Sequence, residues 1–243
     1  MSTPPGLLAA IDMGSNSFRL EIGRIAAGRY RRQAYFKETV RLGAGLDADR
    51  RLTEDAAQRG LACLRGFASE LQGMDPVHVR AVATQTMREA ANRDEFLRRA
   101  QPVLGFPIEV ISGREEARLI YAGVSHLQPS QERRLVVDIG GRSTELILGE
   151  GLLPLKAESF PVGSVSLSMR YFPDGRLTAD AFRAAQIAAG AHFEEVLSAF
   201  APSEWTTAMG SSGTVGAVSQ ILQAQGWTDG RITPRALAAL MRA

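Results

Sequence analysis

Two nine-residue stretches of this sequence are near-copies: "DMGSNSFRL" at residues 12–20 and "DIGGRSTEL" at residues 138–146. They begin 126 residues apart, and each has Asp first, Gly two residues on, Ser five residues on and Leu eight residues on. Each lies between two strand-like apolar runs, so each is expected at the tip of a β-hairpin. The repetition predicts two related structural units, each opening with the same turn.

The segments around the two turns follow a similar order of elements. Three strand-like runs come first, and helices and strands alternate after them. The strand pattern restarts after the polar stretch "QPSQERR" at 128–134, which is the best candidate for a linker. We therefore expect an α/β fold of two domains, residues 1–125 and 126–243, rather than one sheet. The expected strands are 7–12, 17–25, 30–36, 78–85, 108–112, 134–141, 143–150, 152–160 and 205–210. The expected helices are 53–72 with Thr53 as N-cap, 92–104, one following Ser112 and Gly113, 178–200, 215–225 and one opened by Thr233 and Pro234.

Composition and charge exclude several classes of protein. With 45% hydrophobic residues, a chain of 243 residues can bury one large core or two modest ones. The formal net charge of +2 does not indicate a nucleic-acid-binding surface. The single cysteine, Cys63, cannot form an internal disulfide, which suits a reducing cytosol. No stretch approaches the roughly 18 apolar residues of a membrane span, so we expect a soluble, cytoplasmic protein with no membrane partner.

Each turn carries groups suited to an anion and a metal ion. Glycine permits close approach of the backbone, and N–H, hydroxyl and amide groups can cradle phosphate. Asp12 and Asp138, at the ends of apolar strands, can coordinate Mg²⁺. For one copy alone, a simple tight hairpin explains the same residues. Two copies, one opening each domain, favour a functional site.

A third loop, "AMGSSGTVGA" at residues 208–217, follows an expected strand and precedes an expected helix. Its small and hydroxyl residues would place N–H groups at a helix N-terminus, where an anion is favoured. An ordinary strand-to-helix connection capped by Ser or Thr explains the loop equally well.

Taken together, the motifs resemble the exopolyphosphatase and guanosine pentaphosphate phosphohydrolase family. That family lies within the sugar kinase, heat-shock and actin superfamily. The resemblance runs through "AAIDMGSNSFRLEIGR", "VRLGAGL", "AVATQTMREAANRDEFL", "EVISGREEARLIYAGV", "VVDIGGRSTELILGE" and "AMGSSGT". It implies two ribonuclease H-like (actin-like ATPase) domains with an interdomain cleft. The second domain is then incomplete at its C-terminus relative to the family.

The resemblance also assigns roles to single residues. The family's catalytic carboxylate falls on Glu116 as the general base, and Glu115 points about 100° away on the same helix. Without the family, both would be explained as acidic residues of a helix's first turn. Arg88 matches a phosphate-binding arginine able to bind bidentately, and Arg41 matches a family position but suits a surface ion pair equally. The expected phosphate-binding residues are Ser15, Asn16, Ser17, Arg88, Gly140, Gly141, Ser143, Thr144, Gly210, Ser211, Ser212 and Gly213. The expected Mg²⁺ ligands are Asp12, Asp138 and Glu145.

The activity implied by the resemblance is Mg²⁺-dependent hydrolysis of the terminal phosphoanhydride of inorganic polyphosphate. Hydrolysis of guanosine pentaphosphate, non-catalytic binding of polyphosphate or an alarmone, and a kinase or ATPase activity are the alternatives. The sequence leaves open whether the protein forms a homodimer. Arg142 departs from the family, which keeps a small residue there, and the arginine either adds a phosphate contact or crowds the turn.

Overall fold

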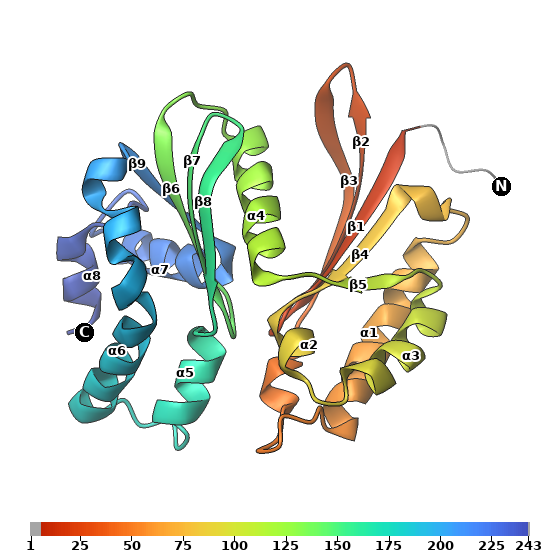
Figure 1. The fold of residues 1–243 in the computed structure, drawn as a ribbon, viewed down its shortest axis with the longest axis horizontal. Coiled ribbons are helices and arrows are strands. Elements are labelled where there is room, and N and C mark those ends of the chain that lie inside the picture. The colour runs from red at the N-terminus through yellow and green to blue at the C-terminus, as the bar shows by residue number, and fades with distance from the viewer. Residues whose placement is uncertain (1–5, 243) are drawn as a thin grey trace. The chain divides into compact units, whose positions relative to one another are not determined.

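The computed structural model describes residues 6–242 and forms two compact units. One unit runs up to Glu116 and includes Val165–Phe182, and the other comprises Ala117–Ser164 and the chain from Arg183 onward. The chain passes from one unit to the other inside helix α4 (Gly113–Leu127). The expected division between residues 125 and 126 falls later in this same helix. Each unit is built on a mixed β-sheet, labelled in Figure 1.

The first unit contains a five-stranded sheet in the order β3-β2-β1-β4-β5. The pairs β1–β2 and β2–β3 are antiparallel, and β4 and β5 add in parallel beyond β1, as expected for a meander followed by helical crossovers. The strands expected in this half are therefore confirmed, with small differences in their ends. The strands are β1 (Leu7–Met13), β2 (Phe18–Ala26), β3 (Arg29–Glu38), β4 (Val79–Ala83) and β5 (Ile108–Val110).

Helices α1 (Glu54–Glu70) and α3 (Arg93–Leu104) cover the apolar side of this sheet and lie side by side (Figure 1). The predicted N-cap of α1 is confirmed, because the Thr53 hydroxyl accepts from the Ala56 N–H at 3.4 Å. The apolar face of α1, which includes Leu61 and Leu64, is buried. Burial of such side chains contributes about 1.5–3 kcal/mol each, so packing on the sheet holds the helix in place.

An ion pair between α1 and α3 makes the stability of the first unit vary with pH in the acid range. Hydrogen bonds from Arg99, and then from Gln58, lower the pKa of Glu54 to about 2. A depressed folded-state pKa adds stability above the ordinary value of 4.5, which is lost as the pH falls toward 2. We expect Glu54→Gln to flatten this part of the curve of unfolding temperature against pH. The pair is exposed, so the effect is small; an unchanged acid-dependent loss in the variant would contradict the assignment.

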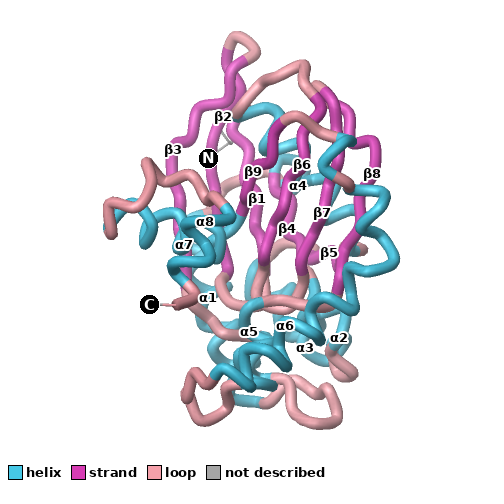
Figure 2. Tube along the Cα trace, turned by 90° about the vertical axis from the view of Figure 1, so that its left-hand side faces the viewer, coloured by secondary structure: helices cyan, strands magenta, loops and turns pink. Residues whose placement is uncertain are grey.

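The second unit contains a four-stranded sheet in the order β8-β7-β6-β9. Its pairing repeats that of β3, β2, β1 and β4 in the first sheet, with β6–β7 and β7–β8 antiparallel and β9 parallel to β6. Figure 2 shows β3 at one edge of its sheet and β8 at one edge of the other. The strands are β6 (Arg133–Ile139), β7 (Thr144–Glu150), β8 (Leu153–Phe160) and β9 (Thr207–Ser211).

The repeat extends to single residues of the hairpins. Both outer strand pairs have an irregular register just before a glycine, at Ile22/Gly23 in one sheet and at Leu148/Gly149 in the other. In both tip turns the α-carbon of the first glycine packs against a carbonyl. A Cβ on Gly14 would lie 3.0 Å from the Ser17 oxygen, and one on Gly140 would lie 3.0 Å from the Ser143 oxygen. The sequence repeat is therefore a structural repeat.

Two helices that the sequence pattern did not predict are α2 (Gln85–Glu89) and α5 (Ser164–Tyr171). Both are short, so they present too little apolar periodicity to be seen in the sequence. The helix expected over 178–200 is α6 (Ala179–Phe193) continued by a 3₁₀ segment, Glu194–Phe200. Helices α7 (Ser212–Ala224) and α8 (Pro234–Leu240) complete the second unit, and the predicted N-cap of α8 is confirmed by the Thr233 hydroxyl accepting from Ala236 N–H at 3.2 Å. Within residues 6–242, the helices are all too short or too polar to cross a membrane.

Candidate active site

The first hairpin tip, between β1 and β2, is held from outside by backbone hydrogen bonds. The Ser15 carbonyl accepts from the Gly43 N–H and the Asn16 carbonyl from the Arg41 N–H, both at 2.8 Å. The Thr86 hydroxyl of α2 donates to the Ser15 hydroxyl oxygen at 2.8 Å, and this contact is buried. Ser15 and Ser17 are themselves buried. Three of the expected phosphate-binding residues thus belong to one pre-shaped turn.

Arg41 supports this turn through its backbone. Its φ of 53° is in the left-handed region, which a non-glycine residue enters only when its surroundings require it. The Arg59 side chain of α1 donates to the carbonyl oxygens of Val40 at 2.9 Å and Arg41 at 3.4 Å. The Arg41 side chain is exposed. These contacts give Arg41 a structural role at the turn, whatever its side chain binds.

Asp12 has a cation of its own within the first hairpin. It is the cross-strand partner of Arg19, whose Nη1 donates to Asp12 Oδ2 at 2.9 Å. Burial raises the pKa of Asp12, and Arg19 opposes this shift. Arg19 neutralises this carboxylate, so a metal ion at Asp12 would have to share it with the guanidinium.

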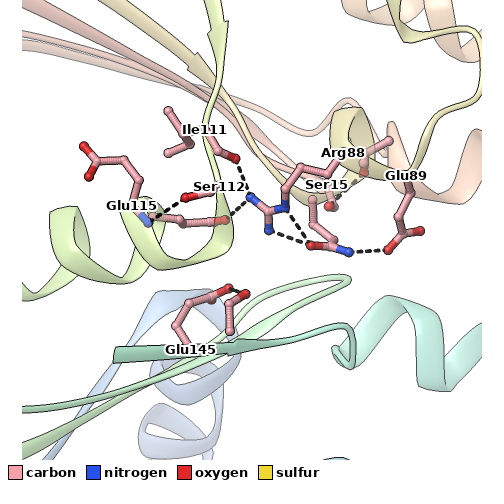
Figure 3. Close-up of polar contacts among 11 residues, drawn as sticks. Ser15, Arg88, Glu89, Ile111, Ser112, Glu115 and Glu145 are labelled. Carbon is pink, nitrogen blue, oxygen red and sulfur yellow. Dashed lines mark hydrogen bonds and ion pairs between the residues drawn. The ribbon is translucent and has the colours of Figure 1, made fainter. Parts of the chain in front are cut away.

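Arg88 and Glu116 meet inside the first unit although they are 28 residues apart in the chain. Arg88 extends from α2, and Glu116 lies in the first turn of α4. Arg88 Nη1 donates to Glu116 Oε2 at 2.9 Å and to the Ile111 carbonyl at 3.0 Å. Only 18% and 17% of the two side chains are exposed, so solvent screens this pair weakly. Figure 3 shows Arg88 beside Ile111.

Glu115, the other acidic residue of this turn, has a different environment. Its backbone N–H is capped by the Ser112 hydroxyl at 3.2 Å, and its carboxylate lies 3.6 Å from Arg80. In Figure 3 its side chain is directed away from Arg88. The structure thus separates the two neighbouring glutamates, as the angle between successive helical residues implies.

The second hairpin tip, between β6 and β7, is braced by the segment that follows β8. The Gly140 N–H donates to the Ser143 carbonyl at 2.9 Å, and the Gly140 carbonyl accepts from the Ser164 N–H at 3.0 Å and hydroxyl at 3.2 Å. The Thr144 hydroxyl donates to the Val162 carbonyl at 2.7 Å. Ser143 and Thr144 are buried. The turn is therefore rigidly positioned by residues 162–164.

Gly163 lets this brace approach the turn closely. A Cβ at Gly163 would lie 2.5 Å from the Arg142 nitrogen and from the Gly141 carbonyl carbon, both backbone atoms. Arg142, the departure from the family pattern, is half-buried. Its backbone is part of a tightly packed turn, so the arginine is accommodated without opening it.

Asp138 and Glu145 form the best candidate metal site. They are direct cross-strand partners in the antiparallel β6–β7 pair, so their side chains extend on the same face of the sheet. Glu145 is 1% exposed and accepts from the Ser159 hydroxyl at 2.8 Å. Mg²⁺ is commonly held by one or two carboxylates with water and phosphate, so this pair fits it; among residues 6–242 no larger cluster of His, Cys, Asp and Glu gathers.

The third loop is joined to the second hairpin within its unit. Ser211 ends β9 beside Asp138 in the parallel register, and Ser212 starts α7. Ser212 has a φ of 78°, and its hydroxyl donates to the Ile139 carbonyl at 2.7 Å. Gly210 packs against the Val215 side chain, and the Ser211 hydroxyl makes no capping bond. The structure thus places residues 210–213 at the start of α7, next to the strand that bears Asp138.

The expected site residues therefore fall into two groups, each gathered within its own unit. Asp12, the first tip, Arg88 and Glu116 belong to one unit; the second tip, Asp138, Glu145 and the third loop belong to the other. Sequence reasoning missed Gln85, which binds Arg88, and Gly163, which packs on the second tip. A Gln three residues before an Arg in a helical turn would have been the only local signal of the first contact.

Residues 22–243 match the model of the Ppx/GppA phosphatase family. The chain belongs to the Ppx/GppA phosphatase family. It is 42% identical to a Haemophilus influenzae relative named "Putative exopolyphosphatase", over 96% of this chain and 72% of that one.

Solved structures of the Ppx/GppA family share the fold. An exopolyphosphatase-like protein matches with a TM-score of 0.83 and 30% identity, covering 90% of this chain and 69% of that one. The Aquifex aeolicus PPX-GPPA enzyme matches with a TM-score of 0.72 and 28% identity, covering 91% of this chain and 72% of that one. A protein of the PilM–PilN type IV pilus biogenesis complex, 13% identical with a TM-score of 0.53, shares the fold alone. The expected α/β fold of actin-like ATPase type is confirmed, and the structure builds it on two mixed sheets.

Proposed function

We propose that this protein is an exopolyphosphatase that removes the terminal phosphate of inorganic polyphosphate. The observation that carries the proposal is the Arg88–Glu116 pair, a mostly buried carboxylate held at 2.9 Å by a guanidinium. The named Haemophilus influenzae relative, at 42% identity, supports the substrate class. A phosphoanhydride hydrolase needs a carboxylate to orient water and cationic or N–H groups to stabilise the phosphoryl oxygens. The described residues offer both.

In this proposal Glu116 is the general base. It accepts a proton from a water molecule that attacks the terminal phosphorus, while the bond to the bridging oxygen breaks and the shortened chain leaves with that oxygen. Arg88 holds the carboxylate through Oε2 and presents positive charge to the phosphate. The tip turns supply N–H and hydroxyl donors, because their backbones are fixed by the braces described above.

Asp138 and Glu145 would hold the Mg²⁺ ion of this reaction. When bound, the ion would neutralise negative charge on the phosphoryl oxygens. The Ser159 hydroxyl keeps Glu145 oriented from the neighbouring strand, a support that metal ligands commonly need. In this proposal Asp12 forms the ion pair with Arg19 inside the first hairpin and is not a metal ligand.

A comparison of substrates tests the proposed function. Phosphate release would be measured from long-chain polyphosphate, guanosine pentaphosphate and ATP, each with Mg²⁺ and with excess EDTA. We expect Mg²⁺-dependent release that is fastest from polyphosphate and is lost in EDTA. Preferred release from guanosine pentaphosphate would assign the alternative substrate. Binding of polyphosphate without release would assign a sensor, and release only from ATP would assign an ATPase.

A further inference from the structure

We propose that Gln85 is a positioning residue that orients Arg88 toward Glu116. The inference rests on the proposed function for its activity readout and on geometry for everything else. Gln85 opens α2, and Arg88 lies three residues further along the same helical turn. Residues at this spacing face each other on a helix.

Gln85 is fixed at both ends of its amide group. Its Oε1 accepts from Arg88 Nε at 2.9 Å and from Arg88 Nη2 at 2.6 Å. Its Nε2 donates to Glu89 Oε1 at 2.6 Å. This orientation of the amide satisfies donor and acceptor together, because a carboxylate can only accept and a guanidinium can only donate. The result is a row of four side chains, Glu89, Gln85, Arg88 and Glu116, whose region is drawn in Figure 3.

The row limits how Arg88 can meet a phosphate. A guanidinium has five N–H donors. Gln85 takes one on Nε and one on Nη2, while Ile111 and Glu116 share Nη1. The Nε–Nη2 edge, which commonly binds a phosphate bidentately, is therefore occupied by the Gln85 oxygen. In this arrangement Arg88 offers phosphate a single Nη2 donor, and its main task is to hold Glu116.

The geometry favours positioning over obstruction. Gln85 and Arg88 lie on the same helical turn, so a movement of one element relative to another would not separate them. Its amide is anchored by Glu89, and the residue is half-buried. A guanidinium bound on its Nε–Nη2 edge is held in one plane, and that plane keeps Nη1 on the Glu116 carboxylate.

Variants that remove or reverse the row test this role. Gln85→Met keeps the length of the side chain and removes the acceptor. Gln85→Glu/Glu89→Gln exchanges the two side chains. The carboxylate at position 85 can then accept from Arg88, and the amide at position 89 can donate to that carboxylate. The matched control is Gln58→Met on α1, because Gln58 makes the same contact with a glutamate four residues away at 2.6 Å.

We expect Gln85→Met to lower kcat about tenfold with KM changed less than threefold, because the variant removes both hydrogen bonds that Arg88 donates to the amide oxygen. The reversed double variant should recover most of kcat, and Gln58→Met should match the wild type. A lower KM with unchanged kcat would mean that Gln85 obstructs the phosphate, and unchanged kinetics would mean that it does not act. Either result would overturn the proposal.

A second measurement tests the role of Gln85 without an assay of phosphate release. The Arg88 Nε–H, identified by NMR from its absence in Arg88→Lys, should exchange with solvent more slowly in the wild type and the double variant than in Gln85→Met. Equal exchange in wild type and Gln85→Met would contradict the positioning role. If the wild type releases no phosphate from any substrate, the proposed function fails, while this comparison still decides whether Gln85 holds Arg88.

Discussion

Replacing Glu116 with Gln should lower kcat for phosphate release from polyphosphate about 1,000-fold, because the amide cannot accept the proton of the attacking water. Gln is nearly the same size and can still accept a hydrogen bond from Arg88, which lies 2.9 Å from the carboxylate. Ligand binding should therefore change little. Release of phosphate at saturating substrate measures the first effect, and equilibrium binding of a short polyphosphate measures the second.

Glu115→Gln is the matched control for this experiment. Glu115 is the next residue on the same helical turn, but its carboxylate lies near Arg80 and not Arg88. We expect its kcat to stay within about twofold of the wild type, because a partly exposed ion pair contributes little energy. Full activity in Glu116→Gln, or the large loss in Glu115→Gln in its place, would show that the base is assigned to the wrong residue.

Replacing Gly163 with Ala should damage the second hairpin tip. The new methyl group would lie 2.5 Å from backbone atoms of Gly141 and Arg142, which cannot swing aside as a side chain can. The turn must shift, and the Gly140 carbonyl would lose its bonds from Ser164. We expect a loss of about 1–3 kcal/mol in the free energy of unfolding, as for other overpacked sites. Displacement of the tip's donors should also lower kcat/KM at least about tenfold.

The control for this substitution is Gly123→Ala in the middle of α4. A Cβ there meets no atom within 4 Å, and the residue is exposed. Alanine should raise the free energy of unfolding by about 0.5–1 kcal/mol, since it loses less conformational freedom on folding than glycine. Urea unfolding and phosphate release are measured for both variants. Equal stability and activity in Gly163→Ala would show that the turn yields easily and is not held by this contact.

Much of the fold could be predicted because its determinants are local or repeated. The strand runs around the two turns, the N-cap at Thr53 and the first turn of α4 all depend on residues close together in the chain. The repeat of "D-x-G-x-x-S" then implied two related sheets. Helix α2 was missed because a single turn has no periodic apolar face, and yet it carries both Gln85 and Arg88. The part of the site on α2 was thus the least visible in the sequence.

The sequence by itself determined the two hairpin turns, the two related α/β units and the residue types able to bind phosphate and Mg²⁺, because spacing and residue chemistry encode these features. Only the tertiary structure decided which charges meet. It joined Arg88 to Glu116, occupied the Nε–Nη2 edge of Arg88 with Gln85, paired Asp12 with Arg19 and set Asp138 opposite Glu145 on the adjacent strand. The physical reason is that pairing depends on distances and directions between side chains, which strand register and helix packing set and which spacing along the chain does not contain.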